Sequence, residues 1–209
     1  MERVRVKVCG ITNREDARLA VRLGADALGF IFTESPRRID VPTARRIIRQ
    51  LPPFVVTVGV FKDQTLSEVI ETMNYVGLSY AQLHGSESPE YARRLGRRAI
   101  KVFSINGTKT REEIERYNLN TIMLDMPKGS VGTILEYADV ARQFVGPSHL
   151  ILAGGLTPEN VGEVILRIRP FAVDVASGVE SYPGKKSVAK LERFIRAVRE
   201  VEHALRATR

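Results

Sequence analysis

The chain has 209 residues, and its 32 Lys and Arg residues against 24 Asp and Glu residues give a formal net charge of +8. Its 44% hydrophobic and 27% charged residues are typical of a globular protein and exclude a disordered or collagen-like chain. No apolar run approaches the roughly 18 residues of a transmembrane helix, and the first residues, MERVRVKVCG, are too highly charged for a signal peptide. We therefore expect a cytoplasmic protein that has no membrane partner.

Short apolar runs rich in β-branched residues alternate with amphipathic stretches along the chain. This alternation predicts a parallel sheet that is covered by helices. The expected strands comprise residues 4–8, 27–32, 54–60, 80–83, 99–103, 121–124, 150–152 and 173–176. Side-chain caps predict where helices begin, with capping boxes of Thr12 with Glu15, Thr65 with Glu68 and Thr110 with Glu113, and a cap followed by proline at Ser88-Pro89 and Thr157-Pro158.

Eight strands in 209 residues leave about 26 residues for each strand and its helix, which fits a compact (β/α)8 barrel. The rival architecture, an open doubly wound sheet, usually has a glycine-rich turn after its first strand, and Cys9-Gly10-Ile11-Thr12 is not such a turn. We therefore predict the α/β class, with a single TIM barrel domain over residues 1–209 and a closed parallel sheet of eight strands.

In such a barrel the chemistry takes place at the C-terminal ends of the strands. The residues just past the expected strands supply a thiol, a guanidinium, an imidazole, a carboxylate and two glycine-containing turns. This set suffices for acid/base chemistry on a phosphorylated anion. The candidate site residues at these positions are Cys9, Arg37, His84, Asp125, Gly154, Gly155, Ser177 and Gly178.

The two glycine-containing turns follow the seventh and eighth expected strands, as Ala153-Gly154-Gly155-Leu156 and Ala176-Ser177-Gly178. Barrels commonly bind phosphate at this place, because exposed backbone N–H groups and a helix N-terminus attract an anion. Each set of glycines alone is equally explained by a tight left-handed turn. Their paired position favours phosphate binding.

Strand alternation predicts the direction of the side chains around Cys9. The valines at positions 4, 6 and 8 share one face and meet the helices, so that Lys7 and Cys9 face the barrel interior. Asp174 faces inward on the last strand by the same argument, and a buried ammonium without a partner is costly, so we predict an ion pair between Lys7 and Asp174. Cys9 is explained either as a small buried hydrophobe or as a thiol that Lys7 stabilises as thiolate.

Three further candidates leave alternatives open. Asp125 ends an apolar strand, and residues 126–131 after it are expected to form a flexible loop, which suits a general acid; a helix cap or a surface position is the alternative. His84 is a base, a substrate contact or a strand-end residue that donates to a backbone carbonyl. Arg37 suits bidentate binding of a carboxylate, but alternation does not decide whether Arg37 or Arg38 points inward.

The composition also bears on cofactors and partners. Cys9 is the single cysteine and the three histidines are scattered, so we expect neither a disulfide framework nor a metal site. The Lys and Arg residues are spread along the chain beside acids, so we expect no nucleic-acid partner. The expected partner is a small phosphorylated substrate, and the oligomeric state stays open between a monomer and a homodimer.

The segment Lys7-Val8-Cys9-Gly10-Ile11-Thr12 resembles the K-x-C-G-I-T opening of the phosphoribosylanthranilate isomerase family. The order and spacing of the further matching segments make the resemblance specific, and it runs nearly end to end. These segments are Gly24-Ala-Asp-Ala-Leu-Gly-Phe30, Ser35-Pro36-Arg37, Val58-Gly-Val-Phe61, Gln82-Leu-His-Gly85, Leu124-Asp125, Leu152-Ala-Gly-Gly-Leu156 and Val173-Asp-Val-Ala-Ser-Gly-Val-Glu180.

The resemblance implies a (β/α)8 barrel that converts N-(5-phosphoribosyl)anthranilate into 1-(2-carboxyphenylamino)-1-deoxyribulose 5-phosphate. This Amadori rearrangement belongs to tryptophan biosynthesis and needs no cofactor. The resemblance further implies that Asp125 is the general acid that opens the sugar ring to a Schiff base, and that Cys9 is the general base that removes the C2 proton. By the same resemblance Arg37 binds the anthranilate carboxylate and His84 and Asp174 have supporting roles, while the phosphate is bound by Gly154, Gly155, Ser177 and Gly178.

The chain departs from the family pattern in two places. Residues 128–133 stand where the family has a longer glycine-rich segment, which affects loop closure and product release rather than the reaction. Ser187 stands where the P-G-x-K-D stretch of the family has its acid, which alters a surface or helix-start contact.

Two other functions compete with this interpretation. The related sugar isomerase of histidine biosynthesis is expected to show a twofold repeat with aspartates after strands one and five, where this chain has Cys9 and Ser104. A non-catalytic phosphosugar-binding barrel keeps the phosphate glycines but leaves Cys9 and Asp125 dispensable or pointing apart. Catalysis requires instead that both groups face one pocket.

Overall fold

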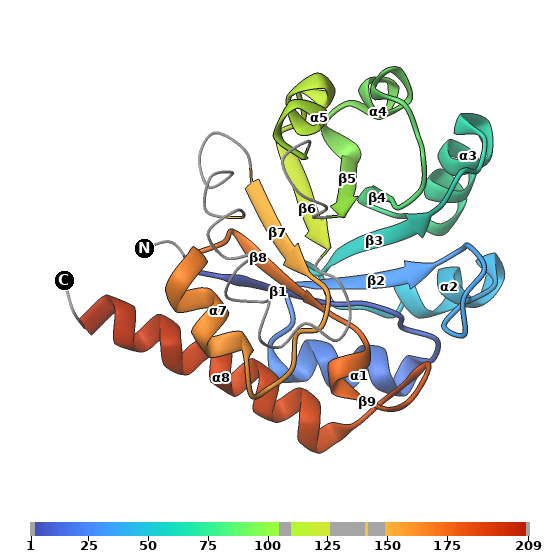
Figure 1. Ribbon diagram of the computed structural model, residues 1–209. Helices are drawn as coiled ribbons and strands as arrows, with labels where there is room; N and C mark the ends of the chain where they lie inside the picture. The colour runs from blue at the N-terminus through green and yellow to red at the C-terminus, as the bar shows by residue number, and fades with distance from the viewer. Residues whose placement is uncertain (1–2, 105–109, 126–140, 142–148, 208–209) are drawn as a thin grey trace.

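Eight parallel strands close into a barrel in the computed structural model, with consecutive strands as neighbours and β8 paired with β1 (Figure 1). This closed sheet confirms the predicted fold class. The structure describes residues 3–104, 110–125, 141 and 149–207. The loop expected at 126–131 and the departure from the family pattern at 128–133 lie outside these residues.

The strands form at the predicted places, and most of their residues are buried because the helices cover the outside of the barrel. Seven of the eight begin and end within one residue of the predicted bounds, and the third begins two residues later than predicted. The strands are β1 (Arg5–Val8), β2 (Ala27–Ile31), β3 (Val56–Phe61), β4 (Tyr80–Leu83), β5 (Ala99–Ser104), β6 (Thr121–Asp125), β7 (His149–Ala153) and β8 (Ala172–Val175).

Helices follow the strands and surround the barrel in Figure 1. They are α1 (Arg14–Leu23), α2 (Val41–Ile48), α3 (Leu66–Val76), α4 (Pro89–Leu95), α5 (Thr110–Tyr117), α7 (Val161–Ile168) and α8 (Val188–Ala207). A short antiparallel hairpin of β9 (Glu180–Tyr182) and β10 (Lys185–Lys186) lies between β8 and α8, and the sequence analysis did not predict it.

Two of the predicted helix caps are confirmed. Thr65 and Glu68 form the capping box of α3, and Ser88 accepts a hydrogen bond from the backbone N–H of Tyr91 just before Pro89 opens α4. The side chain of Thr110, which was expected to cap α5, lies outside the described residues.

Two other predicted caps are wrong. Asn13, not Thr12, caps α1, because the Thr12 hydroxyl donates to the carbonyl of Gly184 in the β9–β10 hairpin. Thr157 does not begin α7, which starts at Val161 after an irregular turn. In both places the local sequence pattern assigned a threonine to the start of a helix. In the structure, the threonine instead takes part in a tertiary contact or in a turn.

The third strand was predicted to begin at Phe54, and this is wrong as well. Phe54 has a φ of 69° and its side chain is fully exposed, so the strand begins only at Val56. The preceding Pro52-Pro53 pair has no backbone N–H to donate to a neighbouring strand, which favours a turn here.

The core has two layers that share the barrel wall. The outer layer packs the outward strand residues against the helices and includes Val4, Val6 and Val8, which confirms their predicted direction. The inner layer fills the barrel with side chains such as Val58, Met123 and Ile151. The inward positions nearest the C-terminal ends of the strands therefore form the floor of any cavity at this end of the barrel.

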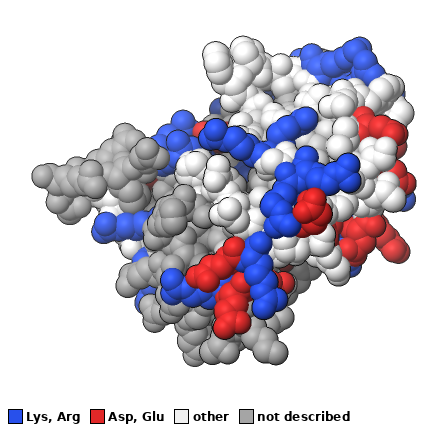
Figure 2. Space-filling view, turned by 90° about the horizontal axis from the view of Figure 1, so that it is seen from above, with Lys and Arg blue, Asp and Glu red and all other residues white. Residues whose placement is uncertain are grey.

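Two properties of the whole molecule bear on its partners. No helix in the described part of the chain is both long enough and apolar enough to cross a bilayer. On the face shown in Figure 2, Lys and Arg side chains are interspersed with Asp, Glu and uncharged residues instead of forming one continuous basic surface.

Candidate active site

A cavity of about 160 Å³ opens at the C-terminal ends of the strands. Strands from all around the barrel contribute to it, which is where the sequence analysis placed the chemistry. Eight of the nine predicted site residues line this cavity, namely Cys9, Arg37, His84, Asp125, Gly154, Gly155, Asp174 and Ser177. The ninth, Gly178, does not line it.

Cys9 lies at the end of β1 in a buried corner of the cavity, with 5% of its surface exposed. Below it, the Nζ of Lys7 lies 2.8 Å from Oδ1 of Asp174, and both side chains are at least nine-tenths buried, which confirms the predicted ion pair. The absence of a side chain at Gly29 of β2 leaves space for Cys9 and Lys7, because a Cβ there would lie 2.7 Å from the Cys9 Sγ and 3.1 Å from the Lys7 Nζ.

Burial and charge act in opposite directions on these groups. Burial raises the pKa of the Cys9 thiol, and the nearby Lys7 ammonium offsets only part of this rise. Burial is the largest single effect on Lys7 and lowers its pKa, but the charges and hydrogen bonds of Asp174 and Cys9 together outweigh it and leave that pKa raised. The expectation that Lys7 stabilises the thiolate is therefore right in direction, yet the thiol of the free protein remains protonated at neutral pH.

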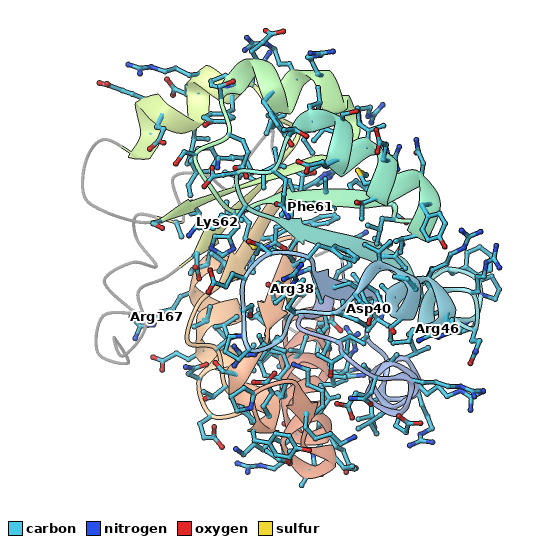
Figure 3. The ribbon with its side chains drawn as sticks, turned by 90° about the vertical axis from the view of Figure 1, so that its right-hand side faces the viewer. Arg38, Asp40, Arg46, Phe61, Lys62 and Arg167 are labelled. Carbon is cyan, nitrogen blue, oxygen red and sulfur yellow. The ribbon has the colours of Figure 1, made fainter. Side chains whose placement is uncertain are left out.

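Arg37 reaches the cavity from the loop after β2 and is held there by Glu180. Its Nε lies 2.9 Å from Oε1 and its Nη2 lies 2.7 Å from Oε2 of that carboxylate, which is a bidentate pair. Hydrogen bonds to Glu180 raise the pKa of the Arg37 guanidinium. Arg38 instead lines a separate hollow with Asp40 and Phe61, and Figure 3 labels these three residues.

Glu180 also connects Arg37 to the surroundings of Cys9. Its Oε1 lies 2.9 Å from the Nζ of Lys186, which is fully buried and donates to the backbone carbonyl of Cys9 at 2.6 Å. Burial alone would raise the pKa of Glu180, but the hydrogen bonds from Arg37 and Lys186 lower it. Sequence reasoning missed both roles, although Glu180 and Lys186 lie in segments that matched the family pattern.

Asp125 lies at the end of β6, and the imidazole of His84 approaches it from the end of β4. The His84 Nε2 is 3.5 Å from Oδ2 of Asp125, and the two side chains are 42% and 31% exposed. Unlike Cys9, this pair is therefore open to water.

The loop that follows His84 is fixed by a buried polar cluster that sequence reasoning also missed. Glu87 accepts hydrogen bonds from the backbone N–H groups of Asp63 and Gly85, at 2.9 and 3.0 Å, and pairs with the Nζ of Lys101 at 2.9 Å. Both partners of the Glu87–Lys101 pair are nearly inaccessible. The cluster ties the loops after β3 and β4 together and so holds His84 at the cavity edge.

The two glycine-containing turns meet at the side of the cavity formed by β7 and β8. Gly154 and Gly155 have φ values of 87° and 63°, so the left-handed turn that was the structural alternative for them is present. A Cβ on Gly178 would overlap the carbonyl oxygen of Leu156, so this glycine lets the two turns touch while Ser177 reaches the cavity. The predicted helix N-terminus is absent directly after Gly155, because α7 starts at Val161.

The described side chains of His, Cys, Asp and Glu include no group of three or more that could hold a metal ion. What converges on the cavity is a thiol, a carboxyl group beside an imidazole, a guanidinium with one edge already paired, and glycine turns. Such a set can transfer protons and bind anionic groups.

Comparison with known proteins identifies the family. The family model described as N-(5'phosphoribosyl)anthranilate (PRA) isomerase matches residues 6–197. The chain belongs to this isomerase family. An N-(5'-phosphoribosyl)anthranilate isomerase of Geobacter metallireducens is 46% identical over 200 residues, which cover 92% of this chain and 98% of the relative.

Solved isomerase structures share the fold along the whole barrel. One in complex with reduced 1-(o-carboxyphenylamino)-1-deoxyribulose 5-phosphate is 41% identical, covers 94% of this chain and 99% of its own, and superimposes with a TM-score of 0.81. A second structure shows a monomeric form that was generated from the dimeric isomerase of Thermotoga maritima. It is 40% identical, covers 94% of this chain and 99% of its own, and superimposes with a TM-score of 0.82.

The protein therefore catalyses the isomerisation of N-(5'-phosphoribosyl)anthranilate in tryptophan biosynthesis. This is the function that the resemblance implied, and it takes precedence over the histidine-biosynthesis isomerase and the non-catalytic barrel. The TIM barrel fold by itself would not have decided between them, because the same fold carries many activities.

Proposed function

We propose that Asp125 is the general acid and Cys9 the general base of this isomerisation. The observation that carries the proposal is that both side chains line one cavity from β6 and β1, which are not neighbours in the barrel. Ring opening needs a proton donor and the following step needs a proton acceptor, so the two groups have to reach different atoms of one substrate.

In the first step, Asp125 donates its proton to the ring oxygen of the sugar as the C1–O bond breaks. The lone pair of the anthranilate nitrogen forms the C1=N bond, which gives a protonated Schiff base. The position of Asp125 at the open side of the cavity, beside His84, supports this role because a carboxyl group there can regain its proton from solvent. His84 assists by contacting the acid.

In the second step, the Cys9 thiolate accepts the proton from C2. The electrons of the C2–H bond form the C1=C2 bond, and the C1=N pair returns to nitrogen, which gives an enolamine. The enolamine becomes the ketone when the C2 hydroxyl loses its proton and C1 gains one. The Lys7 ammonium, which is paired with Asp174, stabilises the negative charge of the Cys9 thiolate. Because burial leaves the pKa of the thiol raised, its thiolate is a strong base once formed.

The anionic ends of the substrate have matching partners at the cavity edge. Glu180 occupies Nε and one Nη2 hydrogen of Arg37, so the remaining edge of the guanidinium is available to the anthranilate carboxylate. We assign the phosphate to Gly154, Gly155 and Ser177 on the β7 and β8 side, with Gly178 allowing these turns to meet. A solved relative in complex with reduced 1-(o-carboxyphenylamino)-1-deoxyribulose 5-phosphate supports the binding of a phosphorylated ligand by this chain.

The acid and base roles are tested by the loss of anthranilate fluorescence when the protein is mixed with freshly made phosphoribosylanthranilate. The chain has no Trp, so its own emission interferes little. Cys9→Ala and Asp125→Asn are each expected to lower kcat by about 10² or more while keeping the circular dichroism of the parent. A variant that keeps more than a tenth of the parent activity would contradict the role of the residue it replaces.

We also propose that the chain forms a homodimer through the N-terminal end of its barrel. Phe54 is fully exposed there and held at a φ of 69°, beside a cavity of about 340 Å³ whose walls include Tyr80 and Phe171. Such a ring beside such a cavity suits reciprocal insertion by two copies. Light scattering at micromolar concentration is expected to give twice the chain mass, and Phe54→Ser half of that value.

A parent of monomer mass at every concentration would contradict the dimer and leave the active-site assignment untouched, because Phe54 lies at the other end of the barrel.

The role of Cys9 also bears on where the protein works. We propose a reducing, cytoplasmic setting, because Cys9 has to remain a free thiol to act as a base.

A further inference from the structure

Gln82 carries an unusual atom in the floor of the active-site cavity. Within the residues that the structure describes, its Oε1 is the buried side-chain nitrogen or oxygen that lacks a hydrogen-bond partner. The residue is 2% exposed and lines the same cavity as Cys9 and Asp125. Buried polar atoms are nearly always paired in folded proteins, so an unpaired one at a binding site calls for a partner from the ligand.

The position of Gln82 follows from strand alternation. In β4, Ala81 and Leu83 face the helices and belong to the outer core, so Gln82 points into the barrel, two residues before His84. Its neighbours across the sheet are Val60 of β3 and Ile100 of β5. Both are aliphatic, so the adjacent strands offer the Gln82 carbonyl no side-chain donor.

The chemistry of the substrate limits which group can satisfy a carbonyl oxygen. Carboxylate and phosphate are acceptors at neutral pH and cannot donate to it. They are also assigned to the cavity edge, to Arg37 on one side and to Gly154, Gly155 and Ser177 on the other. Between these ends lie the anthranilate N–H and the ribose, and the ribose contributes most of the donors, as several hydroxyl groups that can point down to the floor.

We propose that Gln82 is a substrate-binding residue whose side-chain carbonyl accepts a hydrogen bond from a ribose hydroxyl of the substrate and of the product. This inference rests on the proposed function, because it needs the two anionic ends to be bound at the edge. Among the described protein groups the carbonyl has no donor, and the bound sugar supplies one. Gln82 thereby favours a hydroxylated sugar over a deoxygenated one in this position.

Replacing Gln82 by Met separates binding from packing. Methionine has nearly the same volume and length but no carbonyl, so Gln82→Met is expected to raise the Tm of the free protein by about 2–4 °C. The same variant is expected to bind a hydroxylated ligand about 10-fold more weakly, since a sugar hydroxyl then faces an apolar group. A residue that serves only for packing would not move these two quantities in opposite directions.

The experiment is titration calorimetry with two probes, reduced 1-(o-carboxyphenylamino)-1-deoxyribulose 5-phosphate and inorganic phosphate. The proteins are the parent, Gln82→Met, Gln82→Leu and the matched control Gln50→Met, which makes the same chemical change at an exposed position after α2. We expect an about 10-fold higher Kd of the reduced product in both Gln82 variants and an unchanged Kd of phosphate. The control is expected to match the parent.

Each contrary result has a distinct meaning. A parent that does not bind the reduced product contradicts the proposed function itself. A parent that binds it, with Gln82→Met and Gln82→Leu binding within twofold of the parent, overturns the role of Gln82 and leaves the proposed function standing. An equal loss of phosphate affinity in a Gln82 variant also overturns the inference, because the change then disturbs the whole site.

Discussion

The two sides of the active-site cavity are built in different ways. On the side of β1 and β8, Cys9 stands above the buried Lys7–Asp174 pair, and Lys186 holds its carbonyl from the hairpin. On the side of β4 and β6, His84 and Asp125 approach each other at 3.5 Å with about a third of each side chain exposed or more. One side is dry and supported by ion pairs, and the other is open to water.

This difference suits the two proton transfers that we propose. A base that takes a proton from carbon gains from a dry, fixed position, because water would otherwise stabilise the thiolate and weaken it as a base. An acid that has given its proton to the sugar gains from contact with solvent, from which it is protonated again. The contrast between the two sides can be tested by removing their polar partners in turn.

The largest expected effect is on the dry side. Lys7→Met leaves the Asp174 carboxylate buried without its partner, so the free energy of unfolding is expected to fall by about 3–5 kcal/mol. Urea unfolding followed by circular dichroism measures this loss. The double variant Lys7→Met/Asp174→Asn removes the unpaired charge and should regain most of the loss; a double variant no more stable than Lys7→Met would contradict the ion pair as the cause.

The next effect is on the pH dependence of the Cys9 thiol. Because the pKa of Cys9 is raised by burial, its thiolate is a minor form at neutral pH. Below that pKa the thiolate fraction grows about tenfold per pH unit, so the rate at which iodoacetamide alkylates Cys9, the single cysteine of the chain, is expected to rise by up to that factor for each unit between pH 7 and 9. Mass spectrometry of samples quenched at successive times measures this rate. An alkylation rate that does not change with pH over this range would contradict the raised pKa of Cys9.

A smaller effect is expected from the carboxylate that links Arg37 to the dry side. Glu180→Gln leaves Arg37 less firmly held, so KM for phosphoribosylanthranilate is expected to rise about 10-fold with a smaller change in kcat. The pKa of Glu180 is lowered in the folded protein, so its stabilising contribution is complete above the unfolded pKa and is lost as the pH falls toward the folded value.

The stability of Glu180→Gln should consequently fall less than that of the parent between about pH 5 and pH 3. Thermal unfolding at several pH values measures both curves. Parallel curves for the two proteins would contradict the ion pairs of Glu180 as a source of acid sensitivity.

The smallest effect is expected on the open side. His84→Asn removes an exposed contact to Asp125, so the free energy of unfolding should change by about 0.5 kcal/mol or less. Urea unfolding beside Lys7→Met makes the comparison direct. A loss as large as that of Lys7→Met would mean that the two sides are equally supported, and the contrast between them would be wrong.

Much of the architecture could be predicted because it depends on local patterns. The apolar runs gave all eight strand positions, and alternation within a strand was enough to pair Lys7 with Asp174, since β1 and β8 must be neighbours in a closed barrel. Alternation could not place Arg37 or Arg38, because both lie in a loop. Only the folded chain shows that Arg37 meets Glu180, 143 residues later in the sequence.

The errors have a common physical cause. Thr12 and Thr157 both carry the residue type of a helix cap, but Thr12 bonds to Gly184 and Thr157 accepts from the backbone of Glu159 in a turn. Phe54 has the apolar character of a strand, but it lies after two prolines and is exposed. Each of these residue types is compatible with more than one local structure, and the groups that surround it in the folded chain decide which structure forms.

The sequence by itself determined the closed barrel, the family and eight of the residues that line the cavity, because periodicity and motif spacing are written along the chain. Tertiary structure decided how those residues are supported: the hairpin that brings Glu180 and Lys186 to Arg37 and Cys9, the cluster of Glu87 under His84, and the unpaired carbonyl of Gln82. Hydrogen bonding and burial depend on which distant groups meet in space, so no local pattern contains them.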